Sequence, residues 1–135
     1  MNEKELLDYC REWLQAWTGN RPDLLISFYS ENALYSDPAR RDGLRGHSAI
    51  LQYFEKLLAV NKEWTWKPLE VVPTERGCVL KWECAIPVGG KSIIEQGLDI
   101  VEISDDKITR NEVYFDRTAL LKAIDALKQE SRPNR

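Results

Sequence analysis

The chain has 135 residues, 43% hydrophobic and 30% charged, an ordinary balance for one globular domain that buries a core. Its formal net charge of −3 argues against general nucleic-acid binding, which depends on a basic surface. With one His, and three Cys that form no CxxC pair, the sequence predicts neither a metal site nor another cofactor.

The first part of the chain favours helices. Apolar residues recur at three- and four-residue spacing from 3 to about 18, which predicts an amphipathic helix ended by Gly19 and Asn20. Pro22 suits the first turn of a short second helix. An extended stretch, 33–36, leads into the turn signal Asp37-Pro38 and a polar loop up to Gly46, after which a third helix is expected over about 48–60.

From Glu63 onward the apolar pattern changes to a period of two. It predicts strands near 64–74, 77–87, 91–104 and 107–116, with Gly89-Gly90 as the strongest hairpin signal, and then a helix over about 118–128. The charged end, 130–135, is expected to fray. The fold class is therefore α+β, a single domain over 1–135 in which helices pack on a four-stranded antiparallel meander.

The sequence contains no signal peptide and no apolar run long enough to cross a bilayer. We therefore expect a soluble, cytoplasmic protein that binds neither membrane nor nucleic acid.

Three aspartates are the main candidates for a functional site. Asp99 lies mid-strand among aliphatic residues, where a covered carboxylate needs hydrogen-bond partners or a proton, and its parity places it with the inward set Val101 and Ile103. Asp37 either stabilises its own turn or points into a pocket. Asp116 either caps the last helix or takes part in catalysis.

The faces of the other strands leave two alternatives open. Arg110, Glu112, Tyr114 and Asp116 share one face, which is either a polar pocket wall or an exposed, ion-paired surface. The alternating residues Trp82, Cys84 and Ile86 form an apolar face that either makes a homodimer through the outer side of the sheet or is buried by the last helix through Leu120, Leu121 and Ile124. Trp64, Trp66 and Trp82 belong either to that interface or to the pocket mouth.

Several short motifs occur in a characteristic order: Tyr29-Ser30-Glu31-Asn32-Ala33, Tyr35-Ser36-Asp37-Pro38, Gly46-His47-Ser48-Ala49-Ile50, Asp106-Lys107-Ile108 and Glu112-Val113-Tyr114-Phe115-Asp116. With this order the chain resembles, over about 3–127, the SnoaL-like branch of the nuclear transport factor 2-like superfamily. The resemblance implies a strongly curved antiparallel sheet wrapped around N-terminal helices in a cone with an internal pocket.

Two enzyme types of this fold resemble parts of the sequence. In ketosteroid isomerases the proton-shuttling base matches Asp37, a protonated aspartate matches Asp99, and Trp13 stands where the family has a Tyr. An indole N–H can donate a hydrogen bond but is not an acid like a phenol. In limonene-type epoxide hydrolases the water-activating positions match Tyr35, Asp37, Lys81, Glu83 and Asp116, three of which depart from the family's residue types.

Two functions remain as hypotheses. The first is a cofactor-free isomerase, cyclase or hydrolase that acts on a small apolar or polar-aromatic molecule, with Asp37, Asp99 and Asp116 as catalytic residues. Its predicted substrate-binding residues are Trp13, Trp17, Tyr35, Lys81, Glu83, Arg110, Glu112 and Tyr114. The second is a non-catalytic domain that binds a ligand or a protein partner through the same cone.

Overall fold

The computed structural model describes residues 1–130. Its helices are α1 (Glu3–Gln15), α2 (Pro22–Ile26), α3 (His47–Val60) and α4 (Thr118–Glu130). Its strands are β1 (Tyr29–Asp37), β2 (Arg40–Arg45), β3 (Thr65–Pro73), β4 (Gly77–Val88), β5 (Lys91–Ser104) and β6 (Lys107–Tyr114). Of the predicted frayed tail, Glu130 ends α4 and the rest lies outside the described residues.

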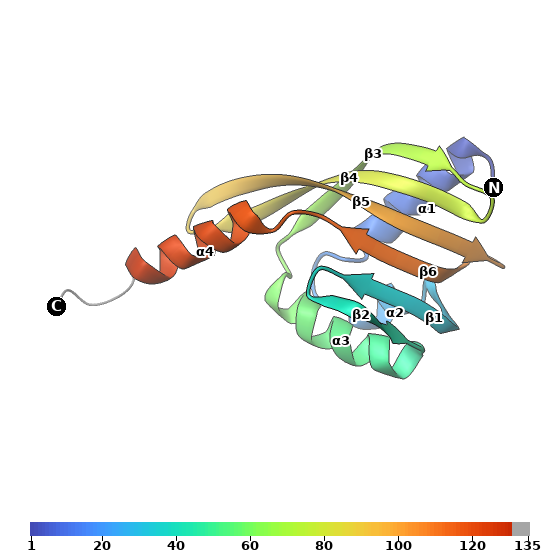
Figure 1. Ribbon diagram of the computed structural model, residues 1–135, viewed down its shortest axis with the longest axis horizontal. Coiled ribbons are helices and arrows are strands. Elements are labelled where there is room, and N and C mark those ends of the chain that lie inside the picture. The colour runs from blue at the N-terminus through green and yellow to red at the C-terminus, as the bar shows by residue number, and fades with distance from the viewer. Residues whose placement is uncertain (131–135) are drawn as a thin grey trace.

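The strands form one curved six-stranded sheet in the order β2-β1-β6-β5-β4-β3, as Figure 1 shows. All neighbours are antiparallel except β1 and β6, which run parallel. The predicted α+β class and curved sheet are confirmed.

The predicted four-stranded meander is wrong in extent, because a hairpin of β1 and β2 adds two strands to it. The stretch expected to be a polar loop up to Gly46 contains β2, whose residues pair with β1 at Leu34–Arg45 and Tyr35–Leu44. This strand lies at the sheet edge, where polar side chains reach solvent, so its sequence lacks the apolar alternation of a covered strand.

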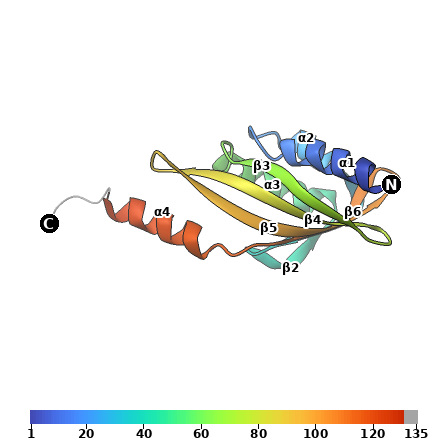
Figure 2. The same cartoon turned by 90° about the horizontal axis from the view of Figure 1, so that it is seen from above.

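Helices cover only one face of the sheet. In Figure 2, α1 and α2 lie together on one side of it. The core between these helices and the sheet is rich in aromatic residues, with Trp13, Tyr29 and Phe54 fully buried. Within residues 1–130 no helix lies across the opposite, outer face, and that face keeps Leu98 exposed at 47%.

Local signals explain where the elements begin and turn. Asn2 Oδ1 accepts a hydrogen bond from the Glu5 backbone N–H at 2.9 Å while Glu5 Oε1 accepts one from the Asn2 N–H at 3.1 Å, a reciprocal cap at the start of α1. The β4–β5 hairpin turns at Gly89 and Gly90, both with positive φ, as the sequence predicted. No helix described between residues 1 and 130 is long and apolar enough to cross a membrane.

Gly97 in β5 lets a large side chain lie flat across the sheet. Its register partner on β4 is Trp82, and a Cβ atom built on Gly97 would come within 2.2 Å of the Trp82 ring. Any side chain at this position would therefore push the indole off the sheet. The glycine is required by this close approach rather than by a turn.

Replacement of Gly97 by Ala is expected to lower the free energy of unfolding by about 2 kcal/mol, because the new methyl group overlaps the Trp82 ring. The exposed neighbour Gln96 provides the matched control: Gln96→Ala should change it by less than about 0.5 kcal/mol. Urea titration of the three proteins measures both effects. Equal stability of wild type and Gly97→Ala would contradict the packing described here.

Candidate functional site

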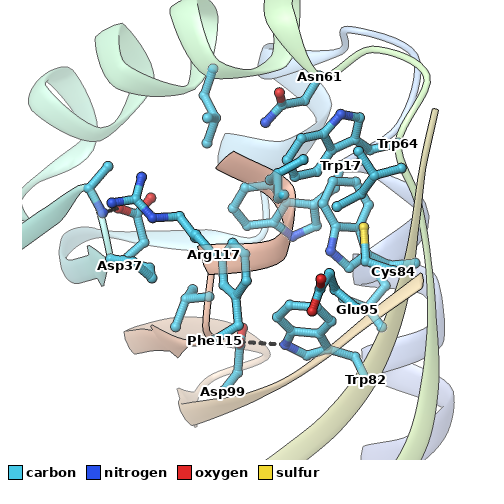
Figure 3. A pocket seen from close by; sticks show the side chains of 18 of the residues that line it. Trp17, Asp37, Asn61, Trp64, Trp82, Cys84, Glu95, Asp99, Phe115 and Arg117 are labelled. Atoms are coloured by element: carbon cyan, nitrogen blue, oxygen red, sulfur yellow. Dashed lines mark hydrogen bonds between the residues drawn. The ribbon is translucent and has the colours of Figure 1, made fainter. Parts of the chain in front are cut away.

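A cavity of about 260 Å³ opens on the inner face of the sheet, where α1, α3 and α4 approach it (Figure 3). Its wall is mostly aromatic and aliphatic, with indole rings from the turn after α1, from the chain before β3 and from β3 and β4. The large rings are Trp17, Trp64, Trp66, Trp82 and Phe115. The charged residues of the wall are Asp37, Glu95, Asp99 and Arg117.

Asp99 lies on this wall and is nearly inaccessible, at 3% exposure. Its Oδ1 accepts a hydrogen bond from Trp82 Nε1 at 2.8 Å, and its Oδ2 accepts one from Asn111 Nδ2 at 2.9 Å. The orientation of the Asn111 amide is fixed in turn, because the Tyr29 hydroxyl donates to Asn111 Oδ1 at 2.9 Å. Each carboxylate oxygen thus receives one N–H and keeps a second acceptor position.

The environment of Asp99 shifts its protonation into the physiological range. Burial disfavours the charged form and raises the pKa of Asp99 to about 7, although the hydrogen bonds from Asn111 and Trp82 act in the opposite direction. The charge of Asp37 contributes a further, smaller increase of the Asp99 pKa. Near pH 7 this carboxyl group therefore exists in both protonation states.

Asp37 has a contrasting environment at the other side of the cavity. Its Oδ2 accepts hydrogen bonds from the hydroxyls of Tyr35 at 2.8 Å and Tyr53 at 2.7 Å. Its Oδ1 accepts the backbone N–H groups of Ala39 and Arg40, both at 2.9 Å, which stabilises the β1–β2 turn. Both alternatives predicted for Asp37 are thus present together: it holds its turn and it lines the cavity.

The two phenols bound to Asp37 are held in the neutral form. Burial raises the pKa of Tyr35 well above its ordinary value, and the neighbouring Asp37 charge adds to the increase. Burial and the neighbouring Asp37 also raise the pKa of Tyr53, while the positive charges of Arg40 and Arg117 lower it by a smaller amount. Each phenol keeps its proton and donates it to Asp37 in a hydrogen bond, so the lone pairs of the phenolic oxygens point toward other groups.

The structure brings together four of the predicted site residues: Trp17, Tyr35, Asp37 and Asp99. Trp13 lies behind them in the core, fully buried, with its ring centroid 6.1 Å from that of Trp17.

The other predicted substrate-binding residues do not line this cavity. Lys81 and Glu83 alternate along β4 with the buried Leu80, Trp82 and Cys84, so they point to the outer face of the sheet. The five positions matched to epoxide hydrolases are therefore not assembled, and only Tyr35 and Asp37 of that set border the cavity.

The polar face of β6 is an ion-paired outer surface rather than a pocket wall. Arg110 bonds Glu112 at 2.9 Å and Glu102 at 3.4 Å, and the Tyr114 hydroxyl donates to Glu112 at 2.8 Å. The inner side of β6 carries the alternate residues Asn111, which is fully buried, and Val113, which lines the cavity. Of the two predicted alternatives, the exposed, ion-paired surface agrees with the structure, and Arg110, Glu112 and Tyr114 do not line the cavity as substrate-binding residues.

Asp116 lies outside the cavity and is exposed. Its Oδ1 accepts hydrogen bonds from the Thr118 backbone N–H at 2.9 Å and the Thr118 hydroxyl at 2.6 Å. These bonds lower the pKa of Asp116, as expected of a residue that caps a helix N-terminus.

The predicted dimer surface of Trp82, Cys84 and Ile86 is wrong, because all three side chains are buried and line the cavity. Their alternative, coverage by the last helix, agrees with the structure, since Leu120, Leu121 and Ile124 of α4 border the same cavity. Trp64 and Trp66 also line the cavity, so of the two predicted alternatives they belong to the pocket rather than to the interface.

Four site residues were missed by the sequence analysis: Tyr53, Glu95, Asn111 and Arg117. Glu95 shares the parity of Asp99 along β5, a signal that would have placed it on the same wall. Tyr53 precedes the buried Phe54 on α3, but its hydrogen bond to Asp37 joins elements that the sequence does not place together. Arg117 follows the last strand and has no periodic signal.

The curved sheet, the helices on one face and the cavity define a protein of the nuclear transport factor 2-like fold. The family model of the SnoaL-like domain matches residues 10–111, which is most of the chain. The protein therefore belongs to the SnoaL-like family.

Solved structures agree with this fold. A Catenulispora acidiphila protein with a ketosteroid isomerase-like fold, in complex with trimethylamine, superposes with a TM-score of 0.76 at 16% identity, covering 98% of this chain and 100% of that one. A Jannaschia sp. CCS1 protein proposed to be a SnoaL-like polyketide cyclase superposes with a TM-score of 0.75 at 11% identity, covering 92% of this chain and 94% of that one. SalBIII, an epoxide hydrolase/cyclase-like enzyme of pyran ring formation in salinomycin, gives 0.70 at 16%, covering 85% and 93%. The search of curated proteins gave no significant match.

Replacement of Asp99 by Asn tests the buried carboxyl. The folded pKa of about 7 exceeds the ordinary 3.8, so between about pH 4 and pH 7 the folded state keeps a proton that the unfolded state has lost. Wild-type stability should therefore fall as pH rises through this range. Asp99→Asn removes that loss, and its stability relative to wild type should rise by up to roughly 4 kcal/mol by pH 8. Urea unfolding at pH 4, 6 and 8 measures the difference.

The Asn side chain fits the same hydrogen-bond network, because Asn111 can rotate its amide and donate to the Tyr29 oxygen instead. A second variant, Trp82→Phe, keeps an aromatic ring but removes one donor to the charged form, so it should raise the Asp99 pKa further. Carbon-detected NMR titration of the Asp99 carboxyl reports this directly. Parallel stability curves for wild type and Asp99→Asn would contradict the raised pKa.

Proposed function

We propose that the protein is a cofactor-independent acid–base enzyme, an isomerase or cyclase, acting on a small apolar or polar-aromatic molecule in the cavity. The observation that carries the proposal is Asp99, a buried carboxyl group on an aromatic wall with a pKa of about 7. A group with this pKa is both an effective base and, once protonated, an effective acid at neutral pH.

Asp99 is the residue to which we assign proton transfer. One carboxylate oxygen takes a proton from a carbon or hydroxyl of the substrate, and the neutral acid returns it at a second position, so that protons balance over the cycle. Trp82 and Asn111 hold the carboxylate in place from the sheet side. Because neither can accept the proton from Asp99 through these N–H groups, the transferred proton stays between Asp99 and the substrate.

Asp37 and its two phenols form the positioning part of the site. Asp37 already accepts four hydrogen bonds, so acting as the base would require it to give up one of them. The oxygens of Tyr35 and Tyr53 are instead free to accept a hydrogen bond from a substrate hydroxyl. The two carboxylates thus differ in environment and in role, as in other acid–base pairs.

The ligands of the similar structures do not settle the substrate. The Catenulispora protein was solved with trimethylamine, whereas SalBIII acts in pyran ring formation on the way to a polyether. A non-catalytic domain would use the same aromatic cavity for binding alone. Turnover separates the two functions.

The proposed base can be tested with 5-nitrobenzisoxazole, a flat aromatic carbon acid whose ring opening requires only a desolvated base. The wild-type protein should accelerate the reaction over acetate, with a rate that rises with pH around the Asp99 pKa of about 7. Asp99→Asn should lower the rate by at least about a hundredfold. Glu83→Gln, a carboxylate of the outer sheet face, is the matched control and should keep full activity. A rate unaffected by Asp99→Asn would leave only a binding function.

We also propose that the protein forms a homodimer through the outer face of the sheet, built from other residues than those first predicted. Several apolar side chains of this face are exposed among its charged residues: Leu34, Val72, Ile94, Leu98 and Tyr114. Leu98 lies in its middle, level with Lys81 on β4 and Tyr114 on β6. Exposed apolar side chains of this kind are stabilised when a second copy covers them, and the charged residues between them can pair across the interface.

Light scattering and sedimentation should show a dimer for the wild-type protein. Leu98→Glu introduces a charge at the centre of the face and should give a monomer. Leu24 on α2 has similar exposure but lies on another surface, so Leu24→Glu should leave the dimer intact. A monomeric wild type at tens of micromolar would overturn the proposal.

A further inference from the structure

We propose that the cavity takes a cationic molecule, with a tertiary or quaternary ammonium group held between the carboxylate of Glu95 and the tryptophan rings. The inference rests on the proposed function in that it takes this cavity as the substrate site. It adds the charge of the substrate, which the acid–base role of Asp99 does not specify.

The charges of the wall favour a cation. Three carboxyl groups and one guanidinium border the cavity. Asp37 is satisfied by four hydrogen bonds and Asp99 by two. Glu95 differs from both: within residues 1–130 it has no hydrogen-bond or ion-pair partner in the protein. A half-buried carboxylate on an apolar wall without a partner is costly, and a ligand cation removes that cost.

The position of Glu95 places its charge over the centre of the aromatic wall. It lies two residues from Gly97 on the same face of β5, and its register partner is Cys84. The Trp82 indole occupies the space over Gly97, so Glu95 and Asp99 lie at the two sides of that ring. In Figure 3 the Glu95 carboxylate points into the cavity beside Trp82 and Cys84. Its charge already acts there, since it contributes to raising the pKa of the buried Cys84 thiol.

The aromatic residues provide the second part of a cation site. The Trp66 ring centroid lies 5.9 Å from those of both Trp17 and Trp64, with interplanar angles of 49° and 41°. Rings tilted in this way do not cover one another's faces, so π surface remains on the wall. Ammonium groups bind to such faces, most strongly to tryptophan, and the attraction increases when water is excluded.

Among the described residues 1–130, Arg117 is the one cation of the wall, and it lies away from Glu95. Its charge acts on Tyr53, which bonds Asp37, and Figure 3 shows its guanidinium group on the Asp37 side. This arrangement leaves the Glu95 side of the cavity negative. It also allows the sign of the ligand's charge to be tested, because an anion-binding cavity would depend on Arg117 and not on Glu95.

Choline and 3,3-dimethylbutan-1-ol are the decisive pair of probes, since they have the same shape and hydroxyl group and differ in charge alone. Binding to the full-length protein can be followed by the fluorescence of the cavity tryptophans and by calorimetry. We expect choline to bind at least about tenfold more tightly than its neutral isostere. Glu95→Gln should lower the affinity for choline about tenfold and so reduce the preference by the same factor. The affinity for the neutral alcohol should stay unchanged.

Two further variants fix the interpretation. Glu83→Gln, on the outer face and paired with Lys67, is the matched control and should leave both affinities unchanged. Arg117→Gln should leave choline binding unchanged or strengthen it. Equal binding of the two probes, binding of neither, or a choline affinity that survives Glu95→Gln would each overturn the inference.

The outcome is separable from that of the proposed function. The titration of Asp99 and the ring opening of 5-nitrobenzisoxazole, a neutral molecule, do not involve Glu95. If those succeed while choline shows no preference, the acid–base site stands and its substrate is neutral. If choline is preferred but Asp99→Asn has no effect on turnover, the cavity is a cation-binding site without catalysis.

Discussion

The hydrogen bond from Trp82 to Asp99, at 2.8 Å, is the interaction on which the cavity depends. It exists because Gly97 leaves room for the indole to lie across β5, where a single methyl group would collide with the ring. The same ring forms part of the cavity wall and packs against Phe115, with centroids 5.5 Å apart. One residue without a side chain therefore sets the shape of the wall and the orientation of the carboxylate together.

Two opposing effects determine the chemistry of that carboxylate. Burial alone would keep Asp99 protonated, and the donors Trp82 and Asn111 favour its charged form. With only two donors, the two effects leave the pKa of Asp99 near neutral pH. Asp37 has four donors, two of them backbone N–H groups that also close a turn, so its oxygens are occupied by the fold itself. The difference in function that we propose for the two aspartates follows from this difference in hydrogen-bond supply.

The sequence was sufficient for the periodic parts of this structure and insufficient for the choice of face. The period of two placed β4, β5 and β6 to within two residues, and it placed Asp99 with Val101 on the inner side. The same period divided β4 correctly into two sets, but alternation does not say which set faces the helices, and Lys81 and Glu83 were assigned inward. A composition with Trp, Cys and Ile on one face and Lys and Glu on the other suits a buried inner wall and a solvated outer one. β2 was missed because an edge strand needs no apolar alternation. The contact of Tyr53 with Asp37 was missed because it joins α3 to β1, which the sequence does not place together.

The two faces of the sheet are not independent in this protein. Successive residues of β5 point to opposite sides, so Leu98, exposed on the outer face, lies between Gly97 and Asp99. A partner that covers Leu98 packs directly against the backbone that holds the carboxylate. Backbone displacement there would change the Trp82–Asp99 distance, because both the ring and its acceptor depend on the position of this strand. Covering the outer face would thus restrict the motion of the Asp99 carboxyl group on the inner one, and the dimer that we propose would act on the site without adding a residue to it.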